Sequence, residues 1–127
     1  MPDTNSSGRG GTTVTLPWPS TRLSPNARLH WSRKSQFVKA ARETSWALTR
    51  GVVGPVPPRW PAAKLDMVLC PPDKRRRDRD TIIASLKAAT DGIADALGTD
   101  DSKFTTTYSM GQPVKGGAVF VTIQGTA

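Results

Sequence analysis

"AAKLDMVLCPPDKRRRDRDTIIASLKAATDGIADALG", residues 62–98, decides the fold of this chain. In its first part Leu65, Met67 and Leu69 alternate with other residues, a period of two that is typical of a strand. Val68 is also apolar, so we expect this strand to be buried on its second face as well. A charged segment and then a helix-forming segment follow. The stretch therefore predicts a strand, a loop and a helix in succession.

Residues 80–98 form the clearest helical segment of the chain. Asp80 suits the N-cap, because its carboxylate accepts a free backbone N–H and complements the positive end of the helix dipole. Gly98 suits the C-terminal stop, because glycine readily adopts the left-handed conformation found there. The expected buried stripe of this helix consists of Ile83, Leu86, Ile93 and Leu97.

The segments before this unit predict one more strand and one more helix. Residues 12–18 place Val14 and Leu16 on one face, which indicates a short strand. An ordered loop then leads to a helix that begins at about Ser35, a suitable N-cap. Its approximate apolar stripe contains Phe37, Ala40, Ala41, Trp46, Ala47 and Leu48.

The C-terminal part predicts two further strands, over residues 103–113 and 116–125, joined as a hairpin across "GQPVKGG". The order β, α, β, α, β, β predicts a mixed α/β fold, with a mixed sheet of about four strands and two main helices. At 127 residues the chain is long enough for one modest core. We assign residues 12–127 to a single domain, and we expect residues 1–11, which lack apolar periodicity, to be a disordered tail.

The composition is strongly basic, with a net charge of +8 and a pI near 10.4. Such a charge favours a polyanionic partner, most commonly nucleic acid. An anionic membrane surface is the alternative, but no basic amphipathic helix with aromatic anchors is evident. Since no apolar run could span a bilayer and the N-terminus does not resemble a signal peptide, we expect a cytoplasmic protein without membrane contact. Cys70 is the single cysteine, which excludes a disulfide framework and favours a small buried hydrophobe.

The charged segment places Asp78 and Asp80 among Arg75, Arg76, Arg77 and Arg79. On extended backbone, a spacing of two directs both carboxylates to the same side. Neighbouring carboxylates repel each other unless a cation neutralises them, and Mg²⁺ does so while keeping positions open for water and phosphate oxygens. With the arginines on phosphates, the segment predicts a site for metal-dependent phosphodiester hydrolysis. A surface loop without metal is the alternative.

Further candidates lie downstream of this pair. A straight helix would place Asp100 and Asp101 roughly 25 Å from Asp80, at about 1.5 Å per residue. A shared metal would then require the loop to fold back or a partner subunit to contribute. Lys87 lies two turns into the helix on the face of Asp80, where it could hold the scissile phosphate or the leaving oxygen. Alternatively, it pairs with Asp91 as an ordinary surface ion pair.

A second basic cluster precedes the first helix and consists of Arg22, Arg28, Arg33 and Lys34. We assign these residues to contacts with the phosphate backbone, and a plain solvated loop is the alternative. For His30, in the same loop, a DNA or structural contact is favoured over a general base. The tryptophans could stack on unpaired bases. However, the helical stripe favours a core position for Trp46, and neighbouring prolines favour loop packing for Trp18 and Trp60.

The segments "RRRDRD", "LKAATDGIADALG" and "DD", in this order, resemble the RusA family of Holliday junction resolvases. The N-terminal "VTLPWP" and "LSPNARLHW" are also similar to that family, so the resemblance runs from about residue 13 to the C-terminus. It implies a homodimeric endonuclease that depends on Mg²⁺, with Mn²⁺ as an expected substitute. Its substrate would be branched DNA, four-way junctions cut by paired symmetric nicks. Many members are phage-borne, so a bacterial host with a phage or prophage source is expected.

The resemblance assigns roles to individual residues. Asp78 and Asp80 match the two acids of the family's R-R-D-x-D motif, and Asp101 matches its third catalytic acid and metal ligand. Asp100 is the alternative third acid if the register differs by one. Lys87 matches the essential lysine.

One position departs from the family pattern. Members usually carry asparagine directly after the second aspartate, and this chain carries Thr81. A hydroxyl cannot reproduce both ends of an amide, so metal geometry or cleavage would be weakened. Two alternatives follow: a non-catalytic protein of the same fold that binds junctions or other DNA, and a less selective nuclease for branched DNA.

Overall fold

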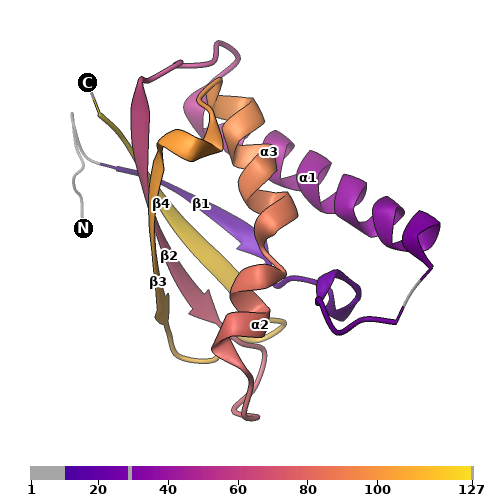
Figure 1. Ribbon diagram of the computed structural model, residues 1–127. Coiled ribbons are helices and arrows are strands. Elements are labelled where there is room, and N and C mark those ends of the chain that lie inside the picture. The colour runs from indigo at the N-terminus through magenta and orange to yellow at the C-terminus, as the bar shows by residue number, and fades with distance from the viewer. Residues whose placement is uncertain (1–10, 29, 127) are drawn as a thin grey trace.

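The four predicted strands are all present in the computed structural model, which describes residues 11–28 and 30–126 (Figure 1). The strands are β1 (Thr12–Pro17), β2 (Ala62–Cys70), β3 (Phe104–Met110) and β4 (Ala118–Thr126). The helices are α1 (Trp31–Val53), α2 (Arg79–Ala84) and α3 (Lys87–Leu97), with short 3₁₀ turns η1 (Thr21–Leu23) and η2 (Asp101–Lys103). The predicted small mixed α/β domain with a four-stranded mixed sheet is confirmed. The tail predicted over residues 1–11 lies outside the described residues, except for Gly11.

The strand order is β1-β4-β2-β3, so the predicted hairpin between β3 and β4 is wrong. β4 lies between β1 and β2 and is antiparallel to both, with Val121 opposite Val14 on one side and Met67 on the other. β3 lies at the edge of the sheet, parallel to β2. The buried residues of β4 suit an inner strand, whereas β3 is rich in threonine and half exposed, as an edge strand can be.

The helices lie on one side of the sheet, and the core fills the space between them (Figure 1). The core residues are Val14, Leu16, Ala63, Leu65, Met67, Leu69, Ile82, Leu86, Ile93, Leu97, Val119, Val121 and Ile123. This set contains the predicted inward residues of β1, β2 and the second helical segment, except Ile83, which packs against it. Cys70 is buried, as expected. Because β2, α2, α3 and β3 form a parallel crossover, the charged segment leaves the carboxyl end of β2, where ligand sites of α/β sheets commonly lie.

α1 begins at Trp31, earlier than the predicted start near Ser35. The reason is that His30 serves as its N-cap: the Nδ1 atom accepts a hydrogen bond from the backbone N–H of Ser32 at 3.3 Å. The same nitrogen lies 2.8 Å from the Ser32 hydroxyl. His30 therefore makes a structural contact, one of the two roles expected for it.

α1 packs on α3 through small residues, and its predicted apolar stripe is present only in part: Phe37 and Ala41 are half-buried, whereas Ala40, Trp46, Ala47 and Leu48 are exposed. Its buried residues are Ser45 and Thr49, and Trp46, expected in the core, is 44% exposed. The Ser45 hydroxyl donates to the carbonyl oxygen of Ala89 in α3 at 2.6 Å. Gly92 of α3 lies so close that a Cβ there would overlap the backbone of α1 and lie 2.9 Å from the Ser45 Cβ. Large apolar side chains do not fit between helices at this separation.

The helix predicted over residues 80–98 consists of two segments. Its N-cap is Asp78 rather than Asp80, because the Asp78 side chain accepts the free backbone N–H of Asp80. The α-helical pattern is interrupted where the N–H of Leu86 donates to the carbonyl of Ile83 at 3.0 Å, a 3₁₀-type bond. α3 then continues to the predicted stop at residue 98, where the backbone is left-handed with φ of 68°. Over residues 11–28 and 30–126, no helix combines the length and the apolar character needed to cross a membrane.

Candidate metal and nucleic-acid site

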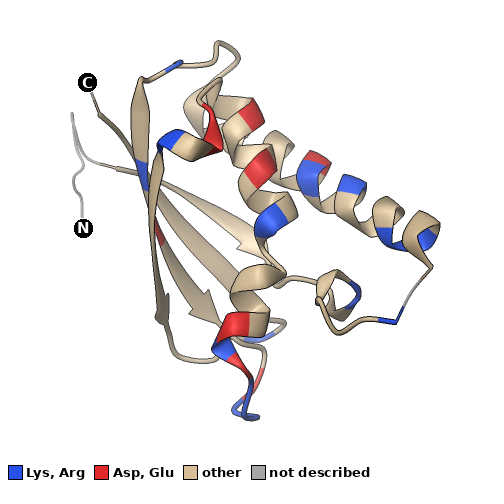
Figure 2. Ribbon diagram, in the orientation of Figure 1, with Lys and Arg blue, Asp and Glu red and all other residues tan. Residues whose placement is uncertain are grey.

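Residues 71–80, here called the charged segment, run from the end of β2 into the first turn of α2 and bring acidic and basic residues together at this end of α2 (Figure 2). Asp73 organises the turn. Its Oδ1 accepts the backbone N–H of Arg75 at 2.9 Å and lies 2.9 Å from Nη2 of Arg77. The N–H of Arg75, followed by the guanidinium of Arg77, lowers the pKa of the Asp73 carboxyl below its ordinary value. Asp73, which the sequence did not single out, therefore fixes the conformation of the segment.

The arginines of the charged segment differ in their surroundings. Arg77 is 18% exposed at its side chain, donates to the carbonyl oxygens of Asp73 and Arg75, and stacks 6.0 Å from the ring centroid of Trp18. Arg79 donates from Nη2 to the carbonyl oxygen of Tyr108 in β3 at 2.8 Å. These two guanidinium groups hold the segment to the domain.

Arg75 and Arg76 are exposed, and the side chain of Arg75 is 81% accessible. The nearest acid to the Arg75 guanidinium is Asp73, with 3.7 Å between Nε and Oδ1. Arginine reaches phosphate oxygens with a fork of donors, so side chains this accessible are suited to phosphate contacts. Of the four predicted phosphate contacts in the segment, Arg75 and Arg76 are the best placed.

Asp78 is held by two hydrogen bonds. Its Oδ1 accepts the backbone N–H of Asp80 at 3.1 Å, and its Oδ2 accepts the hydroxyl of Thr81 at 2.8 Å. A carboxylate has about four lone-pair positions, so each oxygen keeps one free after accepting one bond. Thr81, the departure from the family pattern, thus orients the first of the candidate acids.

Asp80 lies in the first turn of α2, because the helix begins at Arg79. The extended backbone that the sequence suggested between Asp78 and Asp80 is therefore wrong beyond Asp78. Both carboxylates nevertheless stand at the same helix end, and both residues are exposed. Anionic groups are favoured at a helix N-terminus, which helps to hold two acids close together there.

Lys87 and Asp101 meet, although they are 14 residues apart in the chain. The Lys87 ammonium lies 2.8 Å from Oδ1 of Asp91 and 2.9 Å from Oδ2 of Asp101. These carboxylates, Asp91 first, raise the pKa of Lys87 above its ordinary value, and Lys87 in turn lowers the pKa of Asp101. Lys87 is therefore a fixed cation at neutral pH. The predicted pair of Lys87 with Asp91 is present, and Asp101 joins it rather than remaining beyond the end of α3.

The structure forms two groups from the predicted catalytic residues: Asp78 with Asp80, and Lys87 with Asp101. Within residues 11–28 and 30–126, no three Asp, Glu, His or Cys side chains converge as a metal-binding group. The donor chemistry of the first group nevertheless fits Mg²⁺, since both acids supply hard carboxylate oxygens and are accessible. A metal site shared with Asp101 remains a prediction. For Asp100, the alternative third acid, the side chain caps η2 by accepting the N–H of Ser102.

The second basic cluster lies at the N-terminal end of α1 and in the loop before it. Arg28 and Arg33 are exposed, so both remain suited to phosphate contacts. Lys34 is partly buried and donates to the carbonyl oxygen of Ser24 at 3.2 Å, which ties the loop to the helix. Arg22 lies 5.0 Å from the ring centroid of Phe37.

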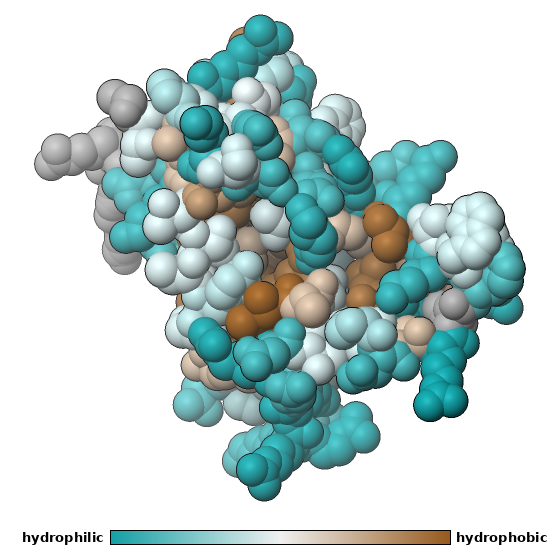
Figure 3. All heavy atoms as spheres, in the orientation of Figure 1, coloured by the Kyte–Doolittle hydropathy of each residue, from teal (hydrophilic) through white to brown (hydrophobic). Residues whose placement is uncertain are grey.

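A groove of about 500 Å³ runs between this loop and the start of α2. We call it the Asp78 groove, and its lining residues are Trp18, Pro19, Ser20, Thr21, Ser24, Asn26, Ala27, Arg77, Asp78, Thr81, Ile82 and Ser85. In the space-filling view, apolar atoms gather in the middle of the face that carries α2 and α3, with hydrophilic side chains around them (Figure 3). Asp78 thus lies in a groove whose far wall comes from the N-terminal part of the chain. The sequence did not predict that this wall lies next to Asp78, although "VTLPWP" and "LSPNARLHW" both contribute residues to it.

The chain is similar to a protein of Xylella fastidiosa (strain Temecula1 / ATCC 700964), with 41% identity over 120 residues. The match covers 88% of this chain and 75% of that protein, so the chain belongs to the same family. The relative is described as an uncharacterized protein and therefore suggests no activity. No protein-family model matches the chain.

Proposed function

We propose that this protein is a Mg²⁺-dependent endodeoxyribonuclease of the RusA type that resolves four-way DNA junctions. One observation carries the proposal: Asp78 and Asp80 stand together at the N-terminus of α2, directly after β2, within an arginine-rich segment that borders a groove. Two accessible carboxylates among cations suit a metal ion and a phosphodiester together. The ordered motifs of the sequence add the RusA resemblance to this geometry.

The roles of the residues follow from their contacts. Arg75 and Arg76 attract the DNA backbone because they are exposed cations. Asp78, oriented by Thr81, and Asp80 would hold the metal. When bound, Mg²⁺ polarises the scissile phosphate and lowers the pKa of a water. Lys87 remains protonated and provides fixed positive charge for the phosphate or the leaving oxygen.

The proposed substrate also calls for two active sites. Paired, symmetric nicks in a four-way junction require sites related by a two-fold axis, and a homodimer supplies them. A dimer could also bring an acid from a second subunit towards Asp78 and Asp80, which would complete the metal ligands. We therefore include a homodimer in the proposed function.

A non-catalytic DNA-binding protein is the second candidate, and a specific contact favours it. Both carboxylate oxygens of Asp78 already accept hydrogen bonds, from Asp80 and Thr81, and Lys87 already pairs with Asp91 and Asp101. In this candidate the acids serve the fold, and the exposed arginines bind DNA without cutting it.

Incubation of a labelled four-way junction with the protein in Mg²⁺, and in parallel in EDTA, tests the proposal. Nicks in Mg²⁺ and binding without nicks in EDTA are the expected results. Binding in both conditions without nicks in either would exclude the nuclease and favour the second candidate. Equal cleavage of forks, flaps and junctions would identify a less selective nuclease for branched DNA.

A further inference from the structure

An apolar cavity of about 210 Å³ adjoins the Asp78 groove. The cavity and the groove share four lining residues, Trp18, Pro19, Ser20 and Ser85, so the two spaces lie next to each other. The groove is the polar part, with Arg77, Asp78 and Thr81, and the cavity is the apolar part. A ligand with one charged end and one flat apolar end would match this division.

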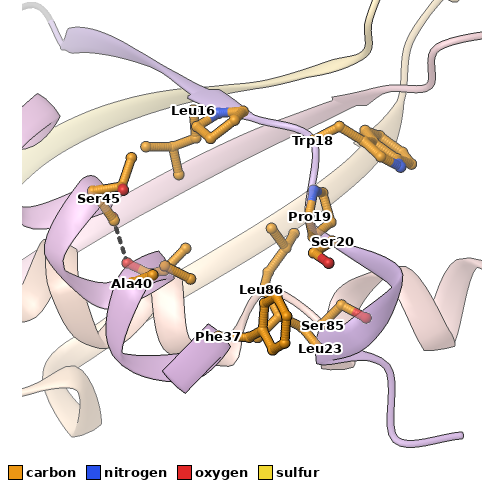
Figure 4. A pocket seen from close by; sticks show the side chains of 14 residues that line it. Leu16, Trp18, Pro19, Ser20, Leu23, Phe37, Ala40, Ser45, Ser85 and Leu86 are labelled. Atoms are coloured by element: carbon orange, nitrogen blue, oxygen red, sulfur yellow. Dashed lines mark hydrogen bonds between the residues drawn. The ribbon is translucent and has the colours of Figure 1, made fainter. Parts of the chain in front are cut away.

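The walls of the cavity come from four elements (Figure 4). Leu16 lies at the end of β1, Phe37 and Ala40 lie on α1, and Leu86 lies at the junction of α2 and α3. In the close view the indole of Trp18 turns away from the centre of the cavity. The centre is therefore bordered by flat or branched apolar side chains. At about 210 Å³ it is smaller than the roughly 300–1,000 Å³ typical of sites for drug-sized ligands, and so suits a single ring system.

Two arginine–aromatic pairs involve residues that line the cavity. Arg22 lies 5.0 Å from the ring centroid of Phe37, and Arg77 lies 6.0 Å from that of Trp18. Phe37 and Trp18 line the cavity and Arg77 lines the adjoining groove, so the positive charge of Arg77 lies beside the cavity. This arrangement is complementary to a ligand whose phosphate remains outside and whose ring enters.

We propose that the cavity receives one unpaired nucleobase of the DNA, next to the phosphate held in the Asp78 groove. The inference rests on the proposed function, and it adds a specificity site to it. Enzymes that do chemistry on a base place the extruded base between aromatic or apolar side chains, and extrusion costs least where base pairing is already weakened. We expect base pairs next to the crossover of a junction to open more readily than those inside an intact duplex. The cavity thus provides a physical reason for a preference for branched DNA.

The test uses the protein with ¹³C-labelled alanine methyl groups and a four-nucleotide thymidine oligomer in EDTA. We expect the methyl resonances of Ala40, Ala41 and Ala89, which line the cavity, to shift on titration, while that of Ala47 stays in place. Ala40→Phe should fill the cavity and weaken binding of the oligomer at least about fivefold, the lower end of the effect of base stacking. Ala47→Phe is the matched control, because it also changes an exposed alanine of α1 and does not line the cavity.

The outcomes separate this inference from the proposed function. Suppose that junctions are bound and cut, but the cavity methyl resonances do not shift and Ala40→Phe binds the oligomer as tightly as the wild type. The inference about the cavity is then wrong, and the proposed nuclease function is unaffected. Methyl shifts that depend on protein concentration rather than DNA would identify a second copy of the chain as the occupant and would also overturn it. A protein that binds neither the oligomer nor a junction would overturn both. Should Ala40→Phe fail to fold, Ala41→Phe and the methyl titration of the wild type still show whether the oligomer binds in the cavity.

Discussion

In the interface between α1 and α3, the side chains of Arg42 and Ser45 find partners inside the fold, whereas in the charged segment several polar side chains are exposed to solvent. Arg42 of α1 donates twice to Asp95 of α3, at 2.6 and 2.9 Å, and Ser45 donates to the backbone of α3. In the charged segment, by contrast, Arg75 and Asp80 are exposed. Substitutions in the interface should therefore change stability and spare activity, and substitutions in the charged segment should do the reverse.

Asp80→Asn should have the largest effect on activity. The change keeps size and removes the charge that would hold Mg²⁺, and loss of even an outer partner of a metal costs about 10–100-fold. We expect junction cleavage to fall at least about 100-fold, with binding retained and the melting temperature unchanged. Gel assays and thermal denaturation measure the two quantities.

Asp95→Asn is the matched control for this substitution. It removes the same charge from the interface, so cleavage should stay at the wild-type rate. Stability should fall only slightly, because the Arg42–Asp95 pair is about half exposed and solvent screens it. A loss of cleavage equal to that of Asp80→Asn would show that net charge, and not the metal site, controls activity.

Gly92→Ala should have the largest effect on stability. A methyl group at this position would overlap the backbone of α1, and overpacking of this kind costs about 1–3 kcal/mol. Gly51 provides the comparison, because a Cβ there meets nothing within 4 Å and alanine favours a helix interior by up to about 1 kcal/mol. Denaturant unfolding should show opposite signs for the two substitutions. Equal stabilisation by both would mean that α1 and α3 are not in close contact.

Thr81→Val should have a smaller effect, confined to the candidate site. It removes the hydroxyl that donates to Asp78, a hydrogen bond of about 1 kcal/mol, and we expect cleavage to fall several-fold through loss of the carboxylate's orientation. Thr81→Ser keeps the hydroxyl and should remain near wild type in both cleavage and stability. If valine and serine behave alike, Thr81 does not orient Asp78.

The smallest predicted effect concerns acid stability. The pKa of Asp101 is lowered, chiefly by the hydrogen bond from Lys87, so the pair stabilises the fold above the ordinary carboxyl pKa of about 4 and loses this contribution as pH falls through the lowered value. Lys87→Met should raise the pKa of Asp101 towards that ordinary value, as measured by carboxyl ¹³C NMR titration. Lys103→Met, in the same turn as Asp101, is the control and should change it little. A pKa that does not respond to Lys87→Met would exclude the ion pair.

The sequence predicted the features that depend on local pattern. The alternation of Leu65, Met67 and Leu69 located β2, and a glycine at residue 98 located the end of α3, because each requires only neighbouring residues. The partner of β4 could not be predicted in this way, since strand pairing joins segments far apart in the chain. The buried face of α1 was missed because Ser45 is small rather than apolar, and its burial depends on Gly92 of another helix.

In the candidate site too, local pattern predicted some features, and contacts between distant residues determined the others. The motif located Asp78 and Asp80, but an aspartate at either position suits an N-cap. The hydrogen bond that Asp78 accepts from the backbone N–H of Asp80 shows that Asp78 is the N-cap. The contact of Lys87 with Asp101 depends on the return of the chain through η2, which no local pattern encodes. In the sequence, Thr81 was identified only as a departure from the RusA pattern. The structure shows that its hydroxyl donates to Asp78, a contact that the sequence did not predict.

The most direct measurement of the central claim compares a four-way junction and a linear duplex of the same sequence, each incubated in Mg²⁺ with wild type and with Asp80→Asn. Denaturing gels would map the cuts on every strand. The account predicts paired nicks at symmetric positions in the junction with the wild type, little cleavage of the duplex, and no nicks with Asp80→Asn. Cleavage of the junction by Asp80→Asn at the wild-type rate, or a wild type that binds the junction and never cuts it, would contradict the account.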